Sequence, residues 1–349
     1  MERQSLTERE QTILQAVVES YIASAEASGS RRIVQQFDLD ISPATVRNTM
    51  ADLEAKGFLA QAHASAGRVP TDVAYRYYVD VLMGRRGLAP AQRLRLEKEL
   101  ALGQQAGELA SLVQRAAQVL GLLTGELGLS VGPILAEAVL HRLDLVPIDS
   151  EKALLVLTLE SGVVRTVYVG LPTALPPDSL RAVAEVMNER LAGDTLRAIH
   201  GTLVERLRDV QLPDPSASRL VNIFVESGPE IFEWAVGAED VHLGSIAVVA
   251  DQPEFHSGER LKALMHLAER RELLASILRG RAMREGTQIT IGAEHPTPEL
   301  SELTIVTASY SIGHVEGVVG VIGPTRMPYD KVVALVGYTS SLVSRLENE

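Results

Sequence analysis

A helix that presents small, hydroxyl, amide and cationic side chains on its outer face could read the edges of DNA bases. Residues 42–57, SPATVRNTMADLEAKG, predict such a helix, because Val46, Met50 and Leu53 recur on one face at spacings of four and three. Small residues allow close approach to a major groove, and Asn and Arg side chains can hydrogen-bond to base edges. The residues at the opposite and flanking positions are Ala44, Thr45, Arg47, Asn48 and Ala51.

A hairpin with one cation follows this helix and could add a contact to the DNA backbone. Residues 58–71, FLAQAHASAGRVPT, predict a strand, a Ser-Ala-Gly turn and a return strand that stops at Pro70. Arg68 lies at this hairpin, where its side chain could reach a phosphate or the minor groove.

Other helices must hold the candidate reading helix in place. Residues 8–24 and about 31–37 predict two of them, while Ser42 is a good N-cap for the third helix and Gly57 ends it. The order helix, helix, turn, helix and hairpin is that of a winged helix. A capped helix followed by a hairpin is also common in proteins that do not bind DNA, so the pattern leaves both interpretations open.

The charge distribution restricts where nucleic acid could bind. The chain has 349 residues and a net charge of −12, which disfavours non-specific coating of nucleic acid, because phosphate affinity comes from cations. Residues 1–90 hold ten Lys and Arg against eleven Asp and Glu, so most of the excess acid lies later in the chain. Residues 41–90 are slightly basic, although their cations could also form a solvated surface. The charged residues of this segment are Arg47, Lys56, Arg68, Arg76, Arg85 and Arg86 against Asp52, Glu54, Asp72 and Asp80.

The sequence contains no motif typical of an enzyme, a metal site or a nucleotide cofactor. It has no Cys, which excludes disulfides, thiolate zinc sites and thiol nucleophiles. Its eight His show no metal-ligand spacing, and no nucleophile-elbow, phosphate-loop or dinucleotide-binding pattern occurs. Gly317, Gly320 and Gly323 repeat within a predicted strand, which favours close backbone packing over phosphate binding. We therefore expect no enzyme activity, no cofactor and no metal.

No targeting or membrane segment is expected. The opening MERQSLTEREQ is charged and lacks an apolar core, and no apolar run is long enough to span a bilayer. These features predict a cytoplasmic protein without membrane contact.

The remainder of the chain predicts an α+β architecture with segregated helices. The tyrosines of a helix over 72–83 favour packing between domains over stacking on nucleic acid, and residues 84–90 predict a linker. Pro-rich breaks at 171–177 and 211–216 suggest an inserted segment, and 219–235 could be helix or strand, interrupted at Gly228-Pro229. Strands are expected at 140–146, 153–159, 163–169, 241–249, 287–291, 303–310 and 315–322, and helices at 91–127, 179–192, 194–208, 257–279 and 329–346.

Five strings, in chain order, resemble one bacterial protein family. The strings SAGRVPT and GVIGPTRM within them are long and unusual, which makes the match specific. The chain is similar in them to the HrcA family of heat-inducible transcription repressors. The strings are LTEREQTILQAVVESYI (6–22), ISPATVRNTMADLEAKGFL (41–59), QAHASAGRVPTDVAYRYYVD (61–80), QITIGAEHP (288–296) and GVVGVIGPTRMPYDKVVALV (317–336).

The resemblance implies a domain organisation and a mechanism. Family members bind an inverted-repeat operator as homodimers and repress chaperonin and Hsp70-type chaperone operons. Chaperonin modulates their activity, and heat stress relieves the repression. The alternative is a metabolite-sensing winged-helix regulator with a ligand-binding GAF-like domain. The expected domains are a winged helix-turn-helix over 1–84, a linker and helix over 85–104, a GAF-like α+β domain over 105–175 and 250–349, and a dimerising domain inserted at 176–249.

The resemblance also carries over nine candidate DNA-binding residues, and helix geometry suggests which of them touch bases. One departure concerns AEASGSRRI at 25–33, which keeps the Gly-Ser of the family but lacks the usual Pro-Val, so the start of the second helix could differ. The candidates are Ser42, Ala44, Thr45, Arg47 and Asn48 on the recognition helix, and His63, Ser65, Gly67 and Arg68 on the wing.

Overall fold

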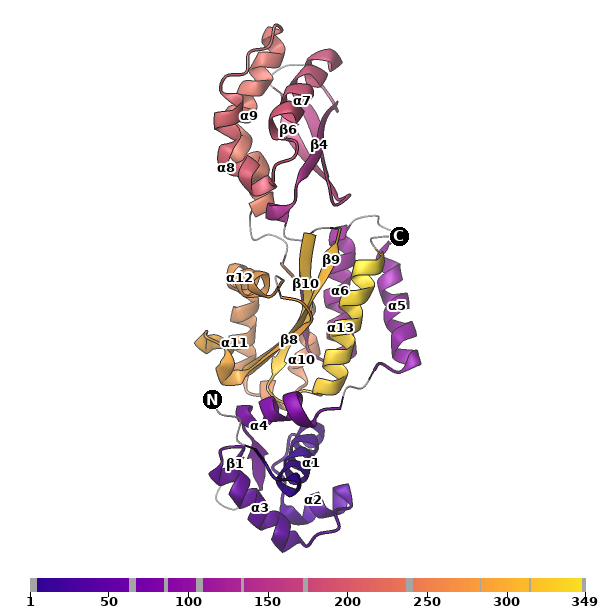
Figure 1. Cartoon of the computed structure of the whole chain (residues 1–349), viewed down its shortest axis with the longest axis vertical. Coiled ribbons are helices and arrows are strands. Elements are labelled where there is room, and N and C mark those ends of the chain that lie inside the picture. The colour runs from indigo at the N-terminus through magenta and orange to yellow at the C-terminus, as the bar shows by residue number, and fades with distance from the viewer. Residues whose placement is uncertain are drawn as a thin grey trace.

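The molecule is elongated, with three units following one another along its long axis (Figure 1). We call them the N-terminal unit (residues 5–84), the sheet unit (87–131 and 241–346) and the inserted unit (135–236). The computed structural model describes residues 5–62, 67–84, 87–104, 109–132, 135–171, 175–236, 241–282, 284–313 and 315–346.

The N-terminal unit consists of helices, a pair of antiparallel strands and a further helix after them. Its core is apolar, since Ile13, Val46 and Leu53 are fully buried. Thr7 caps the first helix through a reciprocal capping box with Glu10, which fixes where that helix begins. The elements are α1 (Glu8–Ser24), α2 (Ser30–Phe37), α3 (Pro43–Ala55), β1 (Leu59–Gln61), β2 (Arg68–Pro70) and α4 (Asp72–Tyr77), which continues as a π-helix over Tyr78–Leu82.

The sheet unit is built around a five-stranded antiparallel sheet in the order β7-β3-β10-β9-β8. The helices α6 and α13 cover one face, with α5 outside them, and α11 and α12 lie on the other face (Figure 1). Its elements are α5 (Pro90–Gln104), α6 (Leu109–Thr124), β3 (Leu127–Val131), β7 (Val241–Leu243), α10 (Ala247–Ala250), α11 (Gly258–Glu269), α12 (Arg271–Ala282), β8 (Thr287–Ile291), β9 (Leu303–Ile312), β10 (Val315–Pro324) and α13 (Tyr329–Leu346). Short 3₁₀ turns lie at Pro253–Phe255, Gly292–Glu294 and Pro298–Leu300.

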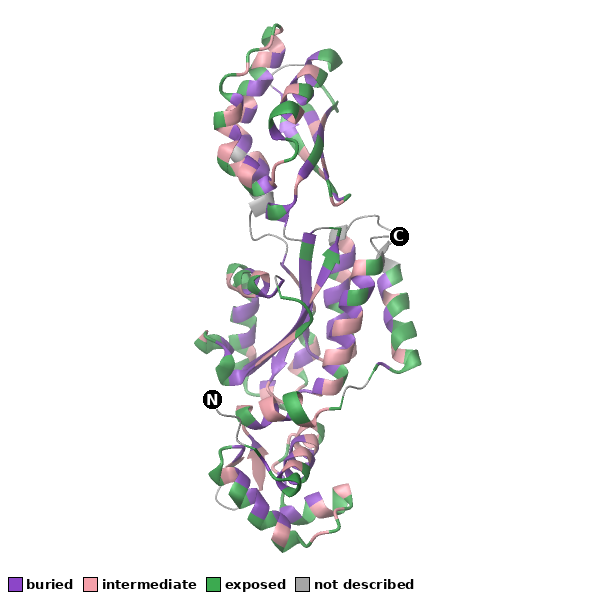
Figure 2. Ribbon diagram, viewed as in Figure 1, coloured by how far each residue is buried: buried purple, intermediate pink, exposed green. Residues whose placement is uncertain are grey.

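The inserted unit has a separate three-stranded antiparallel sheet in the order β4-β5-β6. Helix α7 packs on β4, and α8 and α9 pack on α7 and on each other. The inward residues of the sheet, such as Leu143, Leu155 and Leu157, are fully buried (Figure 2). Its elements are a 3₁₀ turn over Leu135–Glu137, β4 (Leu140–Pro147), β5 (Lys152–Leu159), β6 (Val164–Gly170), α7 (Pro177–Leu191), α8 (Leu196–Leu207) and α9 (Pro215–Val236).

The sheet topology moves the expected boundary of the insertion. The sequence placed residues 105–175 with the GAF-like part and began the insertion at 176. Strands β4, β5 and β6 form a sheet of their own in the described part of the chain, and α7 packs on β4. These strands therefore belong to the same unit as α7–α9. At the other end, β7 pairs with β3, so residues 241–243 lie in the sheet unit rather than in the insertion expected to reach 249.

Several elements differ from the sequence expectation, and packing explains them. The helix expected over 257–279 is two helices, because the backbone at Arg270 leaves the helical region. The helix α9 runs through the expected break at Gly228-Pro229, since Leu220, Phe224 and Phe232 continue one buried stripe along it. The helix expected over 91–127 ends at Thr124, and residues 127–131 form a strand between β10 and β7. Tertiary packing outweighs local propensity in these cases.

Candidate nucleic-acid interface

Helix α3 separates its side chains into a buried face and an exposed face. Val46, Met50 and Leu53 point into the core of the N-terminal unit. Arg47 and Asn48 are exposed. The small residues Ala44 and Ala51 are exposed beside them, so the candidate surface on this helix has a low profile. This arrangement leaves one amide and one guanidinium side chain accessible to a groove-sized partner.

Ser42 and Thr45 have a structural task at the start of α3. The Ser42 hydroxyl oxygen accepts a hydrogen bond from the Thr45 amide at 3.1 Å, and the two hydroxyl oxygens lie 3.0 Å apart. This is a side-chain cap of the kind that typically contributes about 1 kcal/mol to helix stability. The cap accounts for these two residues without any ligand, although both hydroxyl groups remain near the exposed N-terminal end of the helix.

Arg68 does not extend freely from the strand pair. Its Nε donates to Glu54 Oε2 at 2.9 Å, and the Nη2 atom lies 2.7 Å from the same oxygen. Glu54 belongs to the last turn of α3, so this ion pair ties β2 to the candidate reading helix. Only 23% of the Arg68 side chain is exposed. A phosphate would therefore have to compete with the Glu54 carboxylate for this cation.

Gly67 has a packing reason to be glycine. Arg68 and Ser28 exchange two backbone hydrogen bonds of 3.0 Å, which brings the chain before α2 against β2. A Cβ atom on Gly67 would lie 2.3 Å from the Ser28 carbonyl oxygen, which no real contact tolerates. The close approach explains Gly67 without a DNA contact. The other two candidates of this region, His63 and Ser65, lie outside the described residues.

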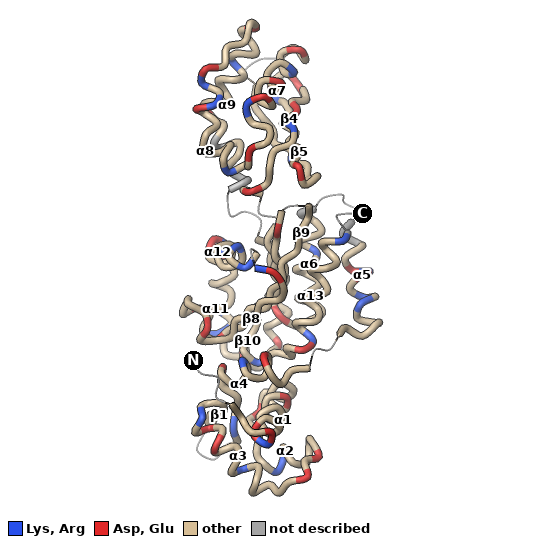
Figure 3. The backbone as a smooth tube through the Cα atoms, in the orientation of Figure 1, with Lys and Arg blue, Asp and Glu red and all other residues tan. Residues whose placement is uncertain are grey.

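The basic balance of residues 41–90 produces few unpaired cations. The Lys56 ammonium lies 2.6 Å from Glu10 Oε1, and its hydrogen bond is the main reason why the pKa of Glu10 is lowered. Arg68 and Arg76 are also paired with carboxylates, while residues 85–86 fall outside the described stretches. Figure 3 shows Lys and Arg mixed with Asp and Glu along the N-terminal unit. Within the described part of the segment, Arg47 is the cation for which no ion pair is found.

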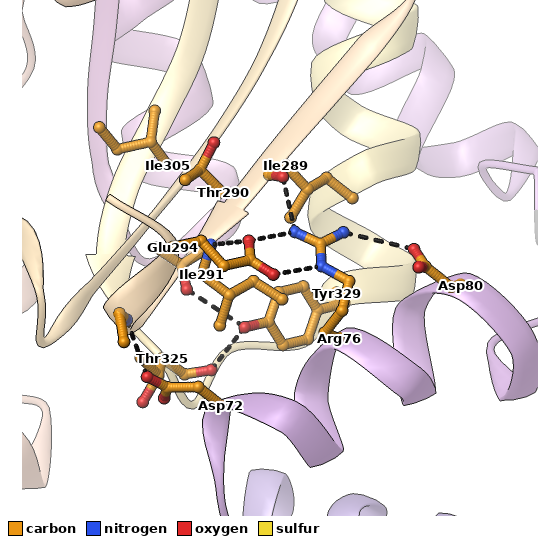
Figure 4. A network of polar contacts seen from close by, with 12 residues as sticks. Asp72, Arg76, Asp80, Ile289, Thr290, Ile291, Glu294, Ile305, Thr325 and Tyr329 are labelled. Atoms are coloured by element: carbon orange, nitrogen blue, oxygen red, sulfur yellow. Dashed lines mark hydrogen bonds and ion pairs between the residues drawn. The ribbon is translucent and has the colours of Figure 1, made fainter. Parts of the chain in front are cut away.

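A network of polar contacts joins the N-terminal unit to the sheet unit (Figure 4). Arg76 of α4 donates from Nε to Glu294 Oε1 at 2.6 Å and from Nη2 to Glu294 Oε2 at 2.5 Å. The same Nη2 atom donates to the Ile289 carbonyl oxygen at 2.7 Å, and Nη1 lies 3.3 Å from Asp80. One turn earlier, the Asp72 carboxylate accepts from the Ala293 amide at 2.9 Å.

Burial and charge act in opposite directions on the acidic partner. Burial alone would raise the pKa of Glu294, but hydrogen bonds from Arg76 and from the Ile291 amide outweigh it and lower the pKa. The Glu294 hydrogen bonds also raise the pKa of Arg76. Both groups are therefore charged at neutral pH.

A second contact lies on the other side of this junction. Arg326, which follows β10, forms a two-point ion pair with Glu254 at 2.5 and 2.9 Å and donates to the Ile22 carbonyl oxygen of α1 at 2.7 Å. Between the two contacts the Tyr75 and Tyr329 rings pack with centroids 5.8 Å apart, and both are buried. The interpretation of the 72–83 tyrosines as packing residues is thus confirmed for Tyr75 and for Tyr78, which is also buried.

A cavity of about 500 Å³ lies beside this junction, between the N-terminal unit and the sheet unit. Its charged walls are mostly neutralised, since Arg326 pairs with Glu254 and Arg260 lies 3.0 Å from Glu302. The described residues thus offer a ligand little unpaired charge at this place. The Tyr75 hydroxyl is buried and has no hydrogen-bond partner among the described atoms.

The remaining motifs are accounted for by packing. A Cβ on Gly320 would lie 2.2 Å from the Val306 carbonyl oxygen of the neighbouring strand, which confirms that the glycine repeat permits close packing in β10. Among the residues that the structure describes, no group of three or more acidic or His side chains could hold a metal ion. Within the same residues, no helix is both long and apolar enough to cross a membrane.

Comparison with known proteins matches the chain over nearly its whole length. The family model "HrcA protein C terminal domain" matches residues 110–333. The chain belongs to the HrcA family. Proteins named "Heat-inducible transcription repressor HrcA" are 33% identical in Chlorobium chlorochromatii (99% of this chain and 98% of that protein), 36% in Natranaerobius thermophilus (95% and 94%) and 34% in Symbiobacterium thermophilum (98% and 98%).

One solved structure shares the fold of this HrcA-family chain. It is described as "Crystal structure of a hypothetical protein at 2.2 A resolution" and has a TM-score of 0.62 at 19% identity, covering 98% of this chain and 99% of that one. The likeness supports a mixed α+β architecture for the whole chain. The HrcA family consists of transcription repressors of the heat-shock response, so the contacts of α3 and of the junction can be considered in that context.

Proposed function

We propose that the chain is a sequence-specific DNA-binding repressor that acts as a homodimer on an inverted-repeat operator upstream of chaperone operons. The observation that carries this proposal is the exposed face of α3, on which Arg47 and Asn48 stand among small residues. In this proposal the N-terminal unit is a winged helix, α3 is its recognition helix, and β1 and β2 are the base of its wing. The sheet unit is the GAF-like part.

The inserted unit supplies the dimer contact in this proposal. Val146, Leu154 and Tyr168 stand side by side across its three strands, and paired residues of an antiparallel sheet point to the same face. Tyr168 is 72% exposed and Val164, on the same face, is 55% exposed. Polar residues such as Thr166 share this face, and exposed apolar residues rimmed by polar ones are typical of an interaction surface. A two-fold dimer formed there would pair two recognition helices with the two halves of a palindrome.

Heat relieves repression in the proposed mechanism, and chaperonin restores it. The acidic sheet and inserted units would repel DNA, so that only the N-terminal unit approaches the phosphates. The repressor would then occupy its operator in the cytoplasm while chaperonin is free, and lose it when chaperonin is diverted to misfolded proteins.

The test is a footprint on DNA taken from upstream of a chaperone operon of the source genome. We expect full-length protein to protect an inverted repeat, to lose this protection on mild heating, and to regain it when chaperonin is added. Protection that appears only with a small metabolite would instead favour the metabolite-sensing alternative. Absence of protection on any such fragment, with or without chaperonin, would contradict the proposal.

A further inference from the structure

The contacts between the N-terminal unit and the sheet unit hold two helices at once. Arg76 and Asp72 attach α4 to the segment that follows β8, and Arg326 attaches the end of α1 through the Ile22 carbonyl oxygen. With a single contact, the N-terminal unit could rotate about that contact. Contacts to two helices, on either side of the packed Tyr75 and Tyr329 rings, restrict this rotation. The N-terminal unit is therefore oriented on the sheet unit, and its attachment does not depend on the connection through residues 84–90 alone.

The local backbone is shaped to make these contacts. Gly292 has a φ of +50°, and a Cβ atom there would lie 2.1 Å from Asp72 Oδ2, so only glycine lets the carboxylate reach the Ala293 amide. The Glu294 carboxylate is positioned by a hydrogen bond from the Ile291 amide at 2.8 Å. It also accepts hydrogen bonds from Nε and Nη2 of Arg76. All three nitrogens of the Arg76 guanidinium make contacts within the chain. Arg76 is thus committed to the junction and is not available to DNA.

The position of the junction gives it a consequence for DNA recognition. The inserted unit lies at the end of the molecule opposite the N-terminal unit (Figure 1). If two chains meet through their inserted units, the distance and rotation between the two α3 helices depend on the geometry of both junctions. Each base pair added between half-sites turns one half-site by about 35° and moves it by about 3.4 Å relative to the other. A rigid junction cannot follow such a change, whereas a loose one can.

We propose that Arg76, Glu294 and Asp72 determine which half-site spacing the repressor accepts, acting through the placement of α3 and without touching DNA. This inference rests on the proposed function. It assigns operator specificity to positioning residues more than 200 positions apart in the chain, in addition to the residues that face the bases.

The experiment uses the full-length protein and a series of DNA fragments. Each fragment carries the inverted repeat recovered by footprinting, with its half-sites moved apart or together in single base-pair steps, and one fragment carries a single half-site. The variants are Arg76→Ala, the milder Glu294→Gln, and Arg76→Lys, which keeps the positive charge but not the two-point contact with Glu294. The matched control is Arg208→Ala, which removes an exposed cation of the inserted unit.

We expect the wild-type protein and the control to bind one spacing with about ten-fold higher affinity or more. At any other spacing only one half-site can be occupied in the correct geometry. Arg76→Ala and Glu294→Gln should flatten this preference and leave single half-site affinity unchanged, and Arg76→Lys should retain part of the preference. Unchanged spacing preference in both Arg76→Ala and Glu294→Gln would overturn the inference while leaving the proposed function intact. A wild-type protein that binds no inverted repeat would overturn both, and loss of single half-site binding in Glu294→Gln would mean that the junction only maintains folding.

Discussion

At the scale of single residues, pairing within the chain decides which side chains remain available to DNA. Lys56 and Arg68 are held by Glu10 and Glu54, whereas no ion pair to Arg47 is found among the described residues. A cation with an intramolecular carboxylate partner must give up that partner before it can bind a phosphate. The cations of residues 41–90 therefore differ in their availability to DNA, although the sequence presents them as one basic segment.

Arg47→Ala is expected to weaken operator binding by roughly ten- to a hundred-fold, because a lost base-edge contact of arginine costs about 1–3 kcal/mol. It should also relax discrimination at one base pair of each half-site. Fluorescence anisotropy with a set of single-base operator variants measures both effects. Arg208→Ala removes the same charge far from α3 and should leave the binding curve unchanged. Equal losses of affinity in the two variants would mean that Arg47 contributes only its positive charge and no base contact.

Glu54→Gln is expected to release Arg68 for the DNA backbone. Affinity for the operator should rise, and the slope of log affinity against log salt should steepen by about 0.9 for one added phosphate contact. The free energy of unfolding should fall by only about 0.5–1 kcal/mol, since the pair is partly exposed. Asp52→Asn is the control, because it removes the same charge from the exposed face of α3 without freeing a cation. Identical salt slopes for the two variants would show that Arg68 only braces the helix.

At the scale of elements, one buried acid joins α6 to β3. Glu126 is 2% exposed, and its Oε2 accepts a hydrogen bond from Gln252 at 3.0 Å. Burial raises the pKa of Glu126 to about 8, against which the Gln252 hydrogen bond acts only partly. The folded protein therefore holds this carboxyl mainly in its neutral form at neutral pH.

Glu126→Gln is expected to stabilise the fold in a pH-dependent way. In the unfolded chain Glu126 ionises above about pH 4.5, while in the folded chain it keeps its proton until about pH 8, so the wild type loses stability across this range. The difference between variant and wild type should grow from pH 4.5 to 8 and then level off, at up to a few kcal/mol from about 1.4 per pKa unit. Thermal unfolding at several pH values measures it, with exposed Glu160→Gln as the control. A difference that does not vary with pH would contradict the assignment.

The sequence predicts local elements well where caps and periodicity agree. Ser42, Pro43 and the apolar spacing of α3 define that helix almost to the residue, and the paired strands β9 and β10 follow from their β-branched runs. The two helices that replace 257–279 could not be separated, because the break at Arg270 carries neither Gly nor Pro. Local pattern does not contain the geometry that tertiary packing imposes.

The contacts of the candidate site are less predictable than its helices. The exposed face of α3 can be derived from helical spacing alone. The commitment of Arg68 to Glu54 could not, because sequence spacing does not say which carboxylate a hairpin cation will meet. The pairing of Arg76 with Glu294 joins residues 218 positions apart, and only the folded chain brings them together. The strings TDVAYRYYVD, QITIGAEHP and GVIGPTRMPY nevertheless contain most of the junction residues, so the available signal was that these unusual strings lie outside the candidate reading helix.

At the scale of the whole molecule, the uncovered sheet face of the inserted unit should decide the oligomeric state. Tyr168→Glu places a charge at the most exposed apolar position of that face, where burial against a second chain would leave it without water. We expect the variant to be monomeric at concentrations where the wild type is a dimer, as measured by light scattering after gel filtration. Met265→Glu, a matched change at a half-exposed position of α11, should remain dimeric. A Tyr168→Glu protein that stays dimeric would place the contact elsewhere.

The pairing of β3 with β7 makes the inserted unit separable from the sheet unit. Val131 and Val241 are direct neighbours in the sheet, so the inserted unit leaves and re-enters at the two ends of what would otherwise be an ordinary hairpin. Replacing everything between them by a tight turn would preserve the register of all five strands. In the proposed function, the surface that joins two chains and the surface that reads DNA therefore belong to separable parts of one chain.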